Sequence, residues 1–131
     1  MIRFLIAILL IAHGLANLAG VFAPWTKTMQ GFKDAPWLFS RNITYQSVAG
    51  RVFSLVWLAS TICLVTAGAG LLLAQPWWIP PAIAGCLCSL AAIVPWWRAV
   101  VPGAYFGAVV DVIVSLLLIS PLKSALLQAI P

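Results

Sequence analysis

Polar side chains with the capacity for acid–base or ligand chemistry stand inside segments of the chain that are otherwise apolar. His13 and Asn17 lie four residues apart in the first apolar run, and Asp111 lies within the last one. A central Asp or Arg in a membrane helix costs about 2.5–3.5 kcal/mol, so such residues persist where they pair or act. Together they could bind the polar end of a lipophilic molecule, or Asp111 and His13 could act on a substrate as acid and base.

The spacing of these residues places them on shared helix faces, because residues three, four or seven apart point the same way. Three faces carry polar or small residues: His13, Asn17 and Gly20 on the first run, Ser47, Arg51, Ser54 and Thr61 on the second, and Gly103, Gly107, Asp111 and Ser115 on the last. The other surfaces of these helices are apolar. We therefore expect the polar faces to meet in the interior of a helix bundle.

The composition requires a membrane environment for this bundle. The 131 residues are 64% hydrophobic and 7% charged, against about 45–50% and about 25% in soluble domains. This excludes a soluble globular domain, and the high hydrophobicity excludes intrinsic disorder. Because about 20 apolar residues cross a bilayer, we predict an all-α integral membrane protein, a single domain over residues 1–131 with four transmembrane helices in an antiparallel bundle, at about 4–23, 48–73, 79–95 and 103–120.

The segments between and after the spans are short, apart from residues 24–47. This stretch mixes basic residues with Met29, Phe32 and Trp37, which predicts an amphipathic segment lying on the membrane surface. Six of the seven tryptophans lie at predicted span ends, where indole suits the lipid–water boundary. Trp57 lies inside the second span, so we expect its N–H to face the protein interior. The tail, 121–131, is expected to be a helical extension at the interface.

Depth within the bilayer brings the polar residues together. The first and third connections share one side of the membrane, so Asn17, Arg51 and Asp111 lie toward that side, with His13 somewhat deeper. An ion pair between Arg51 and Asp111, assisted by Asn17 or His13, would neutralise the acid. More Lys and Arg residues lie on the side of these connections, which predicts that they face the cytoplasm and that both termini lie outside.

Several classes of function are disfavoured by the charges and cysteines. The net charge is +5, but the basic residues are scattered, so nucleic-acid binding is not expected. Cys86 and Cys88 project roughly 200° apart on a helix and cannot form a disulfide with each other. One histidine and one in-span aspartate are too few for a metal site, and no metal motif is present.

The first span carries a short element that resembles known proteins. The residues Ala12-His13-Gly14-Leu15-Ala16-Asn17-Leu18-Ala19-Gly20, with a glycine before the polar residue of the fourth span, are similar to those of small four-helix bacterial membrane proteins. The layout of the whole chain is DoxX-like. The resemblance implies a four-helix bundle in a bacterial inner membrane, and it implies no particular activity.

The sequence leaves several functions open. One is the role of an accessory subunit in a membrane complex. The partner would be another membrane subunit or a second copy of the chain in a homodimer. Another is the binding of a quinone, lipid or pigment in an intramembrane pocket formed by His13, Asn17, Arg51, Ser54, Trp57, Asp111 and Ser115. An isomerase-like acid–base enzyme and a proton-coupled transporter that uses Asp111 are alternatives. The polar cluster could instead tie helices together, with Gly103 and Gly107 allowing close packing.

Overall fold

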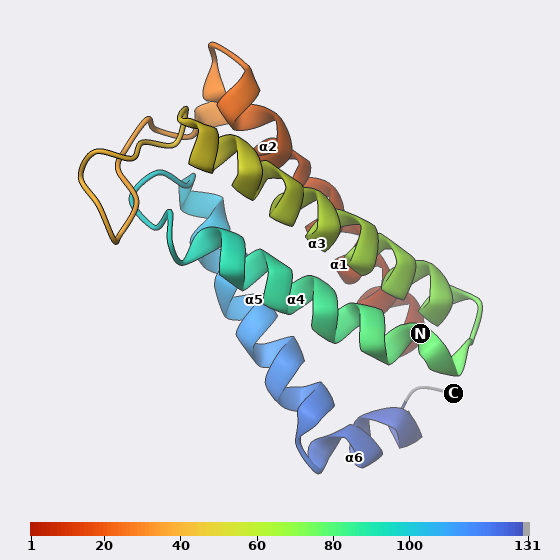
Figure 1. Ribbon diagram of the computed structural model, residues 1–131. Helices are drawn as coiled ribbons and strands as arrows, with labels where there is room; N and C mark the ends of the chain where they lie inside the picture. Colours follow the sequence, from red (N-terminus) through yellow and green to blue (C-terminus); the bar gives the residue numbers. More distant parts are fainter. Residues whose placement is uncertain (130–131) are drawn as a thin grey trace.

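The computed structural model describes residues 1–129, and every long element in this part of the chain is an α-helix (Figure 1). The first span consists of α1 (Ile2–Ala16) and its continuation α2 (Leu18–Phe22). The others are α3 (Val48–Leu72), α4 (Ile79–Ile93), which follows the short helix η3 (Pro76–Trp78), and α5 (Pro102–Ile119). All four spans are long and apolar enough to cross a membrane. The predicted all-α fold with four packed membrane helices is confirmed.

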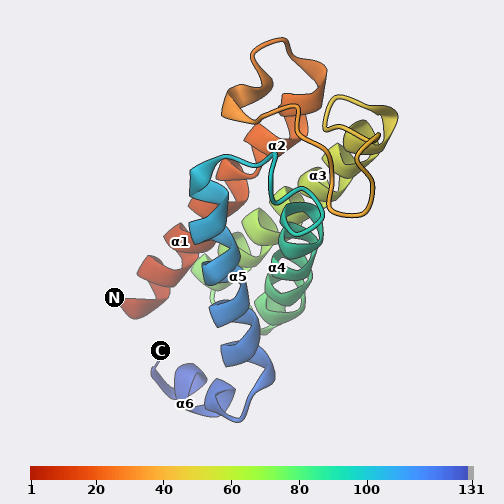
Figure 2. The ribbon, with the colours of Figure 1, turned by 90° about the vertical axis from the view of Figure 1, so that its left-hand side faces the viewer.

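Helix α3 lies at the centre of the bundle and packs against α1 on one side and α4 on the other, while α5 packs against α4 (Figures 1 and 2). Small residues allow the close approach of α1 and α3. A Cβ at Gly14 would lie 3.0 Å from Leu64 Cβ, and one at Gly68 would lie 2.5 Å from Ile11 Cγ1. Since lipid supplies no hydrophobic drive between helices, such close packing is what holds the pair together. The remaining pair, α1 and α5, borders a seam with fewer backbone contacts.

The segment between the first and second spans folds over one end of the bundle. It contains only the short helices η1 (Ala23–Trp25) and η2 (Met29–Gly31). The Lys33 amide donates to the Ala99 carbonyl at 2.8 Å, and the Leu38 amide donates to the Pro95 carbonyl at 2.8 Å, which ties the segment to the connection before α5. Figure 2 shows both connections gathered at this end.

The apolar residues of this segment divide between protein and surroundings. Met29 and Phe32 are buried within the protein, whereas Leu38 and Phe39 remain exposed. Met29 and Phe32 therefore complete the core at this end of the bundle. The reason is that the open end between the helices offers an apolar site within the reach of η2.

The tryptophans also divide. Trp25, Trp77 and Trp97 are exposed near span ends, as an interfacial position requires, but Trp78 and Trp96 are buried. Trp96 is fully buried and meets Tyr45 and Phe53 edge to face, with centroids 5.0 Å and 5.7 Å away, and Trp37 at a tilt, 5.9 Å away. Edge-to-face aromatic packing of this kind fastens the folded-over segment to the ends of α3 and α4.

After a turn at Ser120 and Pro121, the chain forms α6 (Leu122–Ala129), which folds back under the opposite end of the bundle (Figure 2). Leu126 packs against the apolar core at that end. A helix in the tail agrees with the prediction for residues 121–131. The last two positions, 130–131, lie outside the described residues.

Candidate functional site

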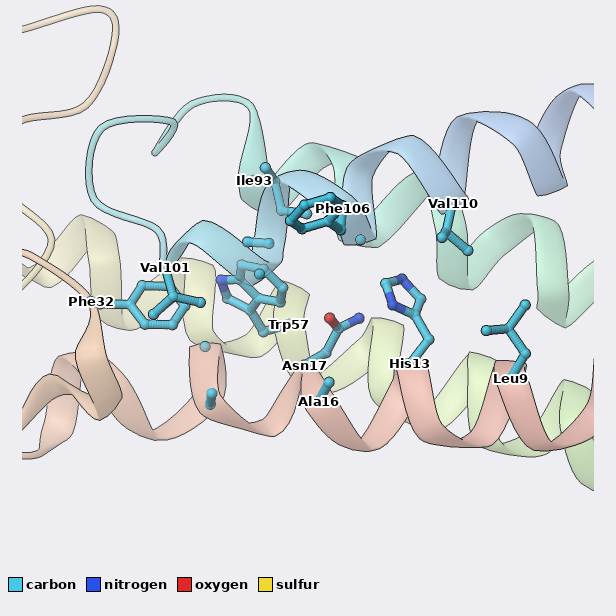
Figure 3. A pocket seen from close by; sticks show the side chains of 15 residues that line it. Leu9, His13, Ala16, Asn17, Phe32, Trp57, Ile93, Val101, Phe106 and Val110 are labelled. Carbon is cyan, nitrogen blue, oxygen red and sulfur yellow. The ribbon is translucent and has the colours of Figure 1, made fainter.

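A cavity of about 340 Å³ lies in the seam between the first span and α5, near the end covered by the connections (Figure 3). We call it the loop-side cavity. Its lining is apolar except for a few side chains, and comprises Leu9, His13, Ala16, Asn17, Ala19, Gly20, Phe32, Trp57, Ile93, Val101, Gly103, Ala104, Phe106, Gly107 and Val110. A concave, apolar site of this size with few polar groups has the form of a small-molecule pocket.

His13 of α1 and Asp111 of α5 join the two helices across the seam. His13 Nε2 lies 2.8 Å from Asp111 Oδ1 and donates to it when the carboxylate is ionised, since a carboxylate only accepts. Asp111 is fully buried, whereas 11% of the His13 side chain is exposed. The carboxylate thus fixes the orientation of the ring, and the ring separates Asp111 from the cavity.

The second ring nitrogen of His13 is open. Nδ1 has no hydrogen-bond partner among residues 1–129, and the ring points into the loop-side cavity beside Asn17 (Figure 3). When Nε2 carries the proton, the neutral imidazole presents a lone pair at Nδ1, and the imidazolium presents an N–H there. His13 can therefore accept a hydrogen bond from a ligand or donate one to it.

Asn17 supplies a second polar group to the cavity. Its Nδ2 donates to Ser60 Oγ at 2.9 Å, and Ser60 Oγ donates to the Gly85 carbonyl at 2.8 Å. Because the single hydroxyl proton of Ser60 is used on Gly85, Ser60 must accept from Asn17, which fixes the amide orientation. The Asn17 carbonyl oxygen is thereby left as an acceptor on the cavity side (Figure 3).

Aromatic rings form the walls of the loop-side cavity. Trp57 is 2% exposed, in agreement with the expected inward orientation, and its ring covers Gly20 so closely that a Cβ there would lie 2.4 Å from Trp57 Cδ2. Phe32 meets Trp57 edge to face at 6.0 Å between centroids and closes the loop end. Leu9 and Phe106 are 49% and 77% exposed, so the cavity opens sideways between α1 and α5 toward the bilayer.

The two glycines singled out on α5 have different surroundings. A Cβ at Gly107 would lie 2.8 Å from His13 Cε1, so the absence of a side chain there makes room for the imidazole. A Cβ at Gly103 would meet no atom within 4 Å, so this glycine borders open space instead of a neighbouring helix. Close packing is thus a property of Gly107 alone in this pair.

Arg51 is not the partner of Asp111, which corrects the ion pair expected from the sequence. Arg51 is exposed, and its guanidinium carbon lies 5.2 Å from the centroid of the Trp25 ring. The reason is that Arg51 lies on an exposed face of α3, which packs against α1 and α4, whereas Asp111 of α5 faces His13 of α1.

Ser54 belongs with Arg51 and not with the cavity. Its hydroxyl donates to the Arg51 carbonyl at 2.6 Å and accepts from Trp25 Nε1 at 3.0 Å. This arrangement holds Trp25 against the outer face of α3. Of the residues proposed from sequence to bind a ligand, the structure brings His13, Asn17 and Trp57 to the loop-side cavity, with Asp111 behind His13.

Two residues that the sequence analysis did not select lie in the polar cluster. The Cys86 thiol of α4 is buried beside the Asp111 carboxylate and the Ser115 hydroxyl, and Ser60 is the link between Asn17 and Gly85. Cys86 gives no sequence signal, because a buried cysteine is usually a small apolar residue. Ser60 precedes Thr61 and points about 100° away from it around α3, so it falls outside the face that Ser47, Arg51, Ser54 and Thr61 define.

The comparisons with known proteins found no protein-family model, curated protein or solved structure that matches this chain. The fold and the apolar helix faces define a small multi-pass membrane protein that contacts the bilayer.

Proposed function

We propose that the protein binds a lipophilic small molecule whose polar end lies in the loop-side cavity, against His13 Nδ1 and the Asn17 carbonyl oxygen. The observation that carries this proposal is the open nitrogen of His13. The ring is held from behind by a fully buried carboxylate and presents its other nitrogen to an apolar cavity of about 340 Å³. A ligand hydroxyl satisfies both sites when Nδ1 carries a proton, because it then accepts from Nδ1 and donates its single proton to the Asn17 carbonyl oxygen.

The shape of the cavity favours a compact ring as the polar end. Trp57, Phe32 and Phe106 offer ring faces and edges around the two polar atoms, and aromatic pairs gain from such contacts beyond the area buried. The sideways opening at Leu9 and Phe106 gives access from the bilayer. Quinols, ring-bearing lipids and hydroxylated pigments share this chemistry.

Acid–base catalysis is a second candidate function, favoured by the hydrogen bond between His13 and Asp111. A carboxylate behind an imidazole fixes the orientation of the ring, so that the outer nitrogen can remove and return a proton. In deuterated water, a substrate processed by His13 would acquire deuterium on carbon with the wild-type protein and not with His13→Gln. A ligand recovered without deuterium on carbon would leave binding as the function.

The histidine itself gives a direct test of the binding proposal, because it is the chain's single histidine. We suggest nitrogen NMR of the isotope-labelled residue in the full-length protein, titrated with para-dodecylphenol. Binding predicts a saturable shift of the Nδ1 signal. Dodecylbenzene, which has the same tail and no hydroxyl, is the matched control and should leave Nδ1 in place. An Nδ1 chemical shift that does not change on titration with the phenol would overturn the proposal.

The accessory-subunit hypothesis makes the opposite prediction for the same experiment. If the polar cluster only ties helices together inside a larger complex, the phenol should produce no saturable change at Nδ1. Other chains should then accompany the protein at fixed stoichiometry when it is extracted from its own membranes.

A further inference from the structure

A second cavity lies in the same seam, on the side of the chain termini. Its volume is about 290 Å³, and it is lined by apolar side chains of α1 and α5, by Trp78 and by Leu126 of α6. We call it the terminus-side cavity. Leu9 and Val110 line this cavity and the loop-side cavity, so the two are neighbours along one groove.

The groove follows a single strip of α5. Gly103, Gly107 and Val110 line the loop-side cavity, and Val110, Val114 and Leu117 line the terminus-side cavity. Their spacing of three and four residues keeps them on one face of an unbroken helix. From Gly103 to Leu117 the strip spans about 21 Å, which is two-thirds of a hydrocarbon core of about 30 Å.

The polarity of the groove is confined to one end. His13 and Asn17 lie in the loop-side cavity, whereas the side chains contributed to the terminus-side cavity by α1, α5 and α6 are Leu, Ile and Val. Phe32, 7% exposed, and Val101 close the loop end, where the Lys33–Ala99 hydrogen bond holds the covering segment. A hydrocarbon tail on a ligand bound at His13 would therefore find apolar surroundings only in the direction of the terminus-side cavity.

We infer that the ligand is an amphiphile with a single hydrocarbon tail, and that the tail lies in the terminus-side cavity along α1 and α5. This inference rests on the proposed binding of the polar end at His13. Leu9 and Ile113 are 49% and 51% exposed, so the groove is open to the bilayer along its length and a tail can enter sideways. In lipid the tail is selected by packing against the groove, because its removal from water is already complete.

Two neighbouring leucines of α5 provide the test. Leu117 is half-buried and lines the terminus-side cavity, whereas Leu116 is 63% exposed on the lipid face. In Leu117→Trp the indole occupies space that the tail would fill. In Leu116→Trp the same change points outward and serves as the matched control. The His13 nitrogen signal reports binding of the probes para-ethylphenol and para-dodecylphenol.

We predict that Leu117→Trp weakens the binding of para-dodecylphenol by about fivefold, the loss expected from the packing contacts of the tail. The affinity for para-ethylphenol should not change. Leu116→Trp should change neither. Val114→Phe, a smaller filler of the same cavity, should repeat the selective loss if Leu117→Trp does not fold. If Leu117→Trp and Val114→Phe both bind para-dodecylphenol with unchanged affinity, and both phenols still shift the His13 nitrogen signal, the tail site is overturned and the proposed function stands. No shift with either phenol would overturn the proposed function itself.

Discussion

His13 and Asp111, which lie 98 residues apart in the sequence, meet at 2.8 Å across the seam between α1 and α5. This contact joins two helices that otherwise share few backbone contacts, and it turns the outer nitrogen of His13 toward an apolar cavity. The same pair thus holds the seam together and equips it for a ligand.

Removal of both partners of this pair should destabilise the protein by less than the sum of the two single removals. His13→Leu leaves a fully buried carboxylate unpaired, and Asp111→Leu leaves the imidazole without its acceptor, each at about 1–3 kcal/mol. The double variant should cost less than the sum, with a coupling of about 1 kcal/mol in the free energy of unfolding. Additive losses, measured by reversible unfolding in detergent, would show that the pair contributes no interaction energy.

Gly107→Ala should weaken ligand binding through the position of His13. The added Cβ would lie 2.8 Å from His13 Cε1, so the ring must move and lose alignment with Asp111. We expect about tenfold weaker binding of para-dodecylphenol, the equivalent of one hydrogen bond. Val109→Ala is the matched control, because this residue is 57% exposed on α5 and does not line the loop-side cavity. Equal affinities in both variants would contradict the role of the imidazole.

The two buried serines of α3 should differ in their effect on the site. Ser60→Ala removes the acceptor that orients Asn17, and we expect about fivefold weaker binding of the phenol probe. Ser54→Ala removes the contacts with Trp25 Nε1 and the Arg51 carbonyl, which lie outside the loop-side cavity, and should leave binding unchanged. Titration of the histidine signal in both variants measures this. A loss of affinity in Ser54→Ala equal to that in Ser60→Ala would exclude a specific role for Asn17.

Tyr45 should make the stability of the covering segment depend on alkaline pH. Burial raises the pKa of the Tyr45 phenol, which donates to the Gly20 carbonyl at 3.3 Å. Below a pH of about 10 the phenol is protonated in the folded and unfolded states alike, so its contribution is complete. Above that pH the unfolded chain ionises first, and stability falls by up to about 1.4 kcal/mol per pH unit.

The measurement for Tyr45 is thermal unfolding in detergent as the pH is raised. Tyr45→Phe cannot ionise and should lose this part of the alkaline decline, whereas Tyr105→Phe, at the start of α5, should keep it. The same decline in wild-type protein and Tyr45→Phe would assign it to other groups.

The sequence predicts the bundle well because apolar runs of spanning length admit few structures in a bilayer. It also selects the polar residues that the membrane would otherwise reject, and His13, Asn17 and Asp111 do gather in one seam. Their partners were harder to predict. Helical periodicity gives the face of a residue but not the rotation of that face relative to a neighbouring helix, so the sequence predicts a pair of Arg51 with Asp111 although Arg51 lies against Trp25.

The folded-over segment shows a second limit of the sequence. Its mixture of basic and apolar residues fits a membrane surface and the open end of a bundle equally well. The choice depends on backbone ties such as Lys33 to Ala99, which carry no side-chain signature. For the same reason, the closure of the cavity by Phe32 could not be predicted from composition.

The most direct measurement is native mass spectrometry of the protein released from its own membranes. The account predicts that the wild-type chain carries one discrete lipophilic molecule. Gly103→Trp, whose indole enters the open space of the loop-side cavity, should lose this molecule, and the outward Leu116→Trp should retain it. An empty wild-type chain, or equal occupancy in Gly103→Trp, would contradict the account.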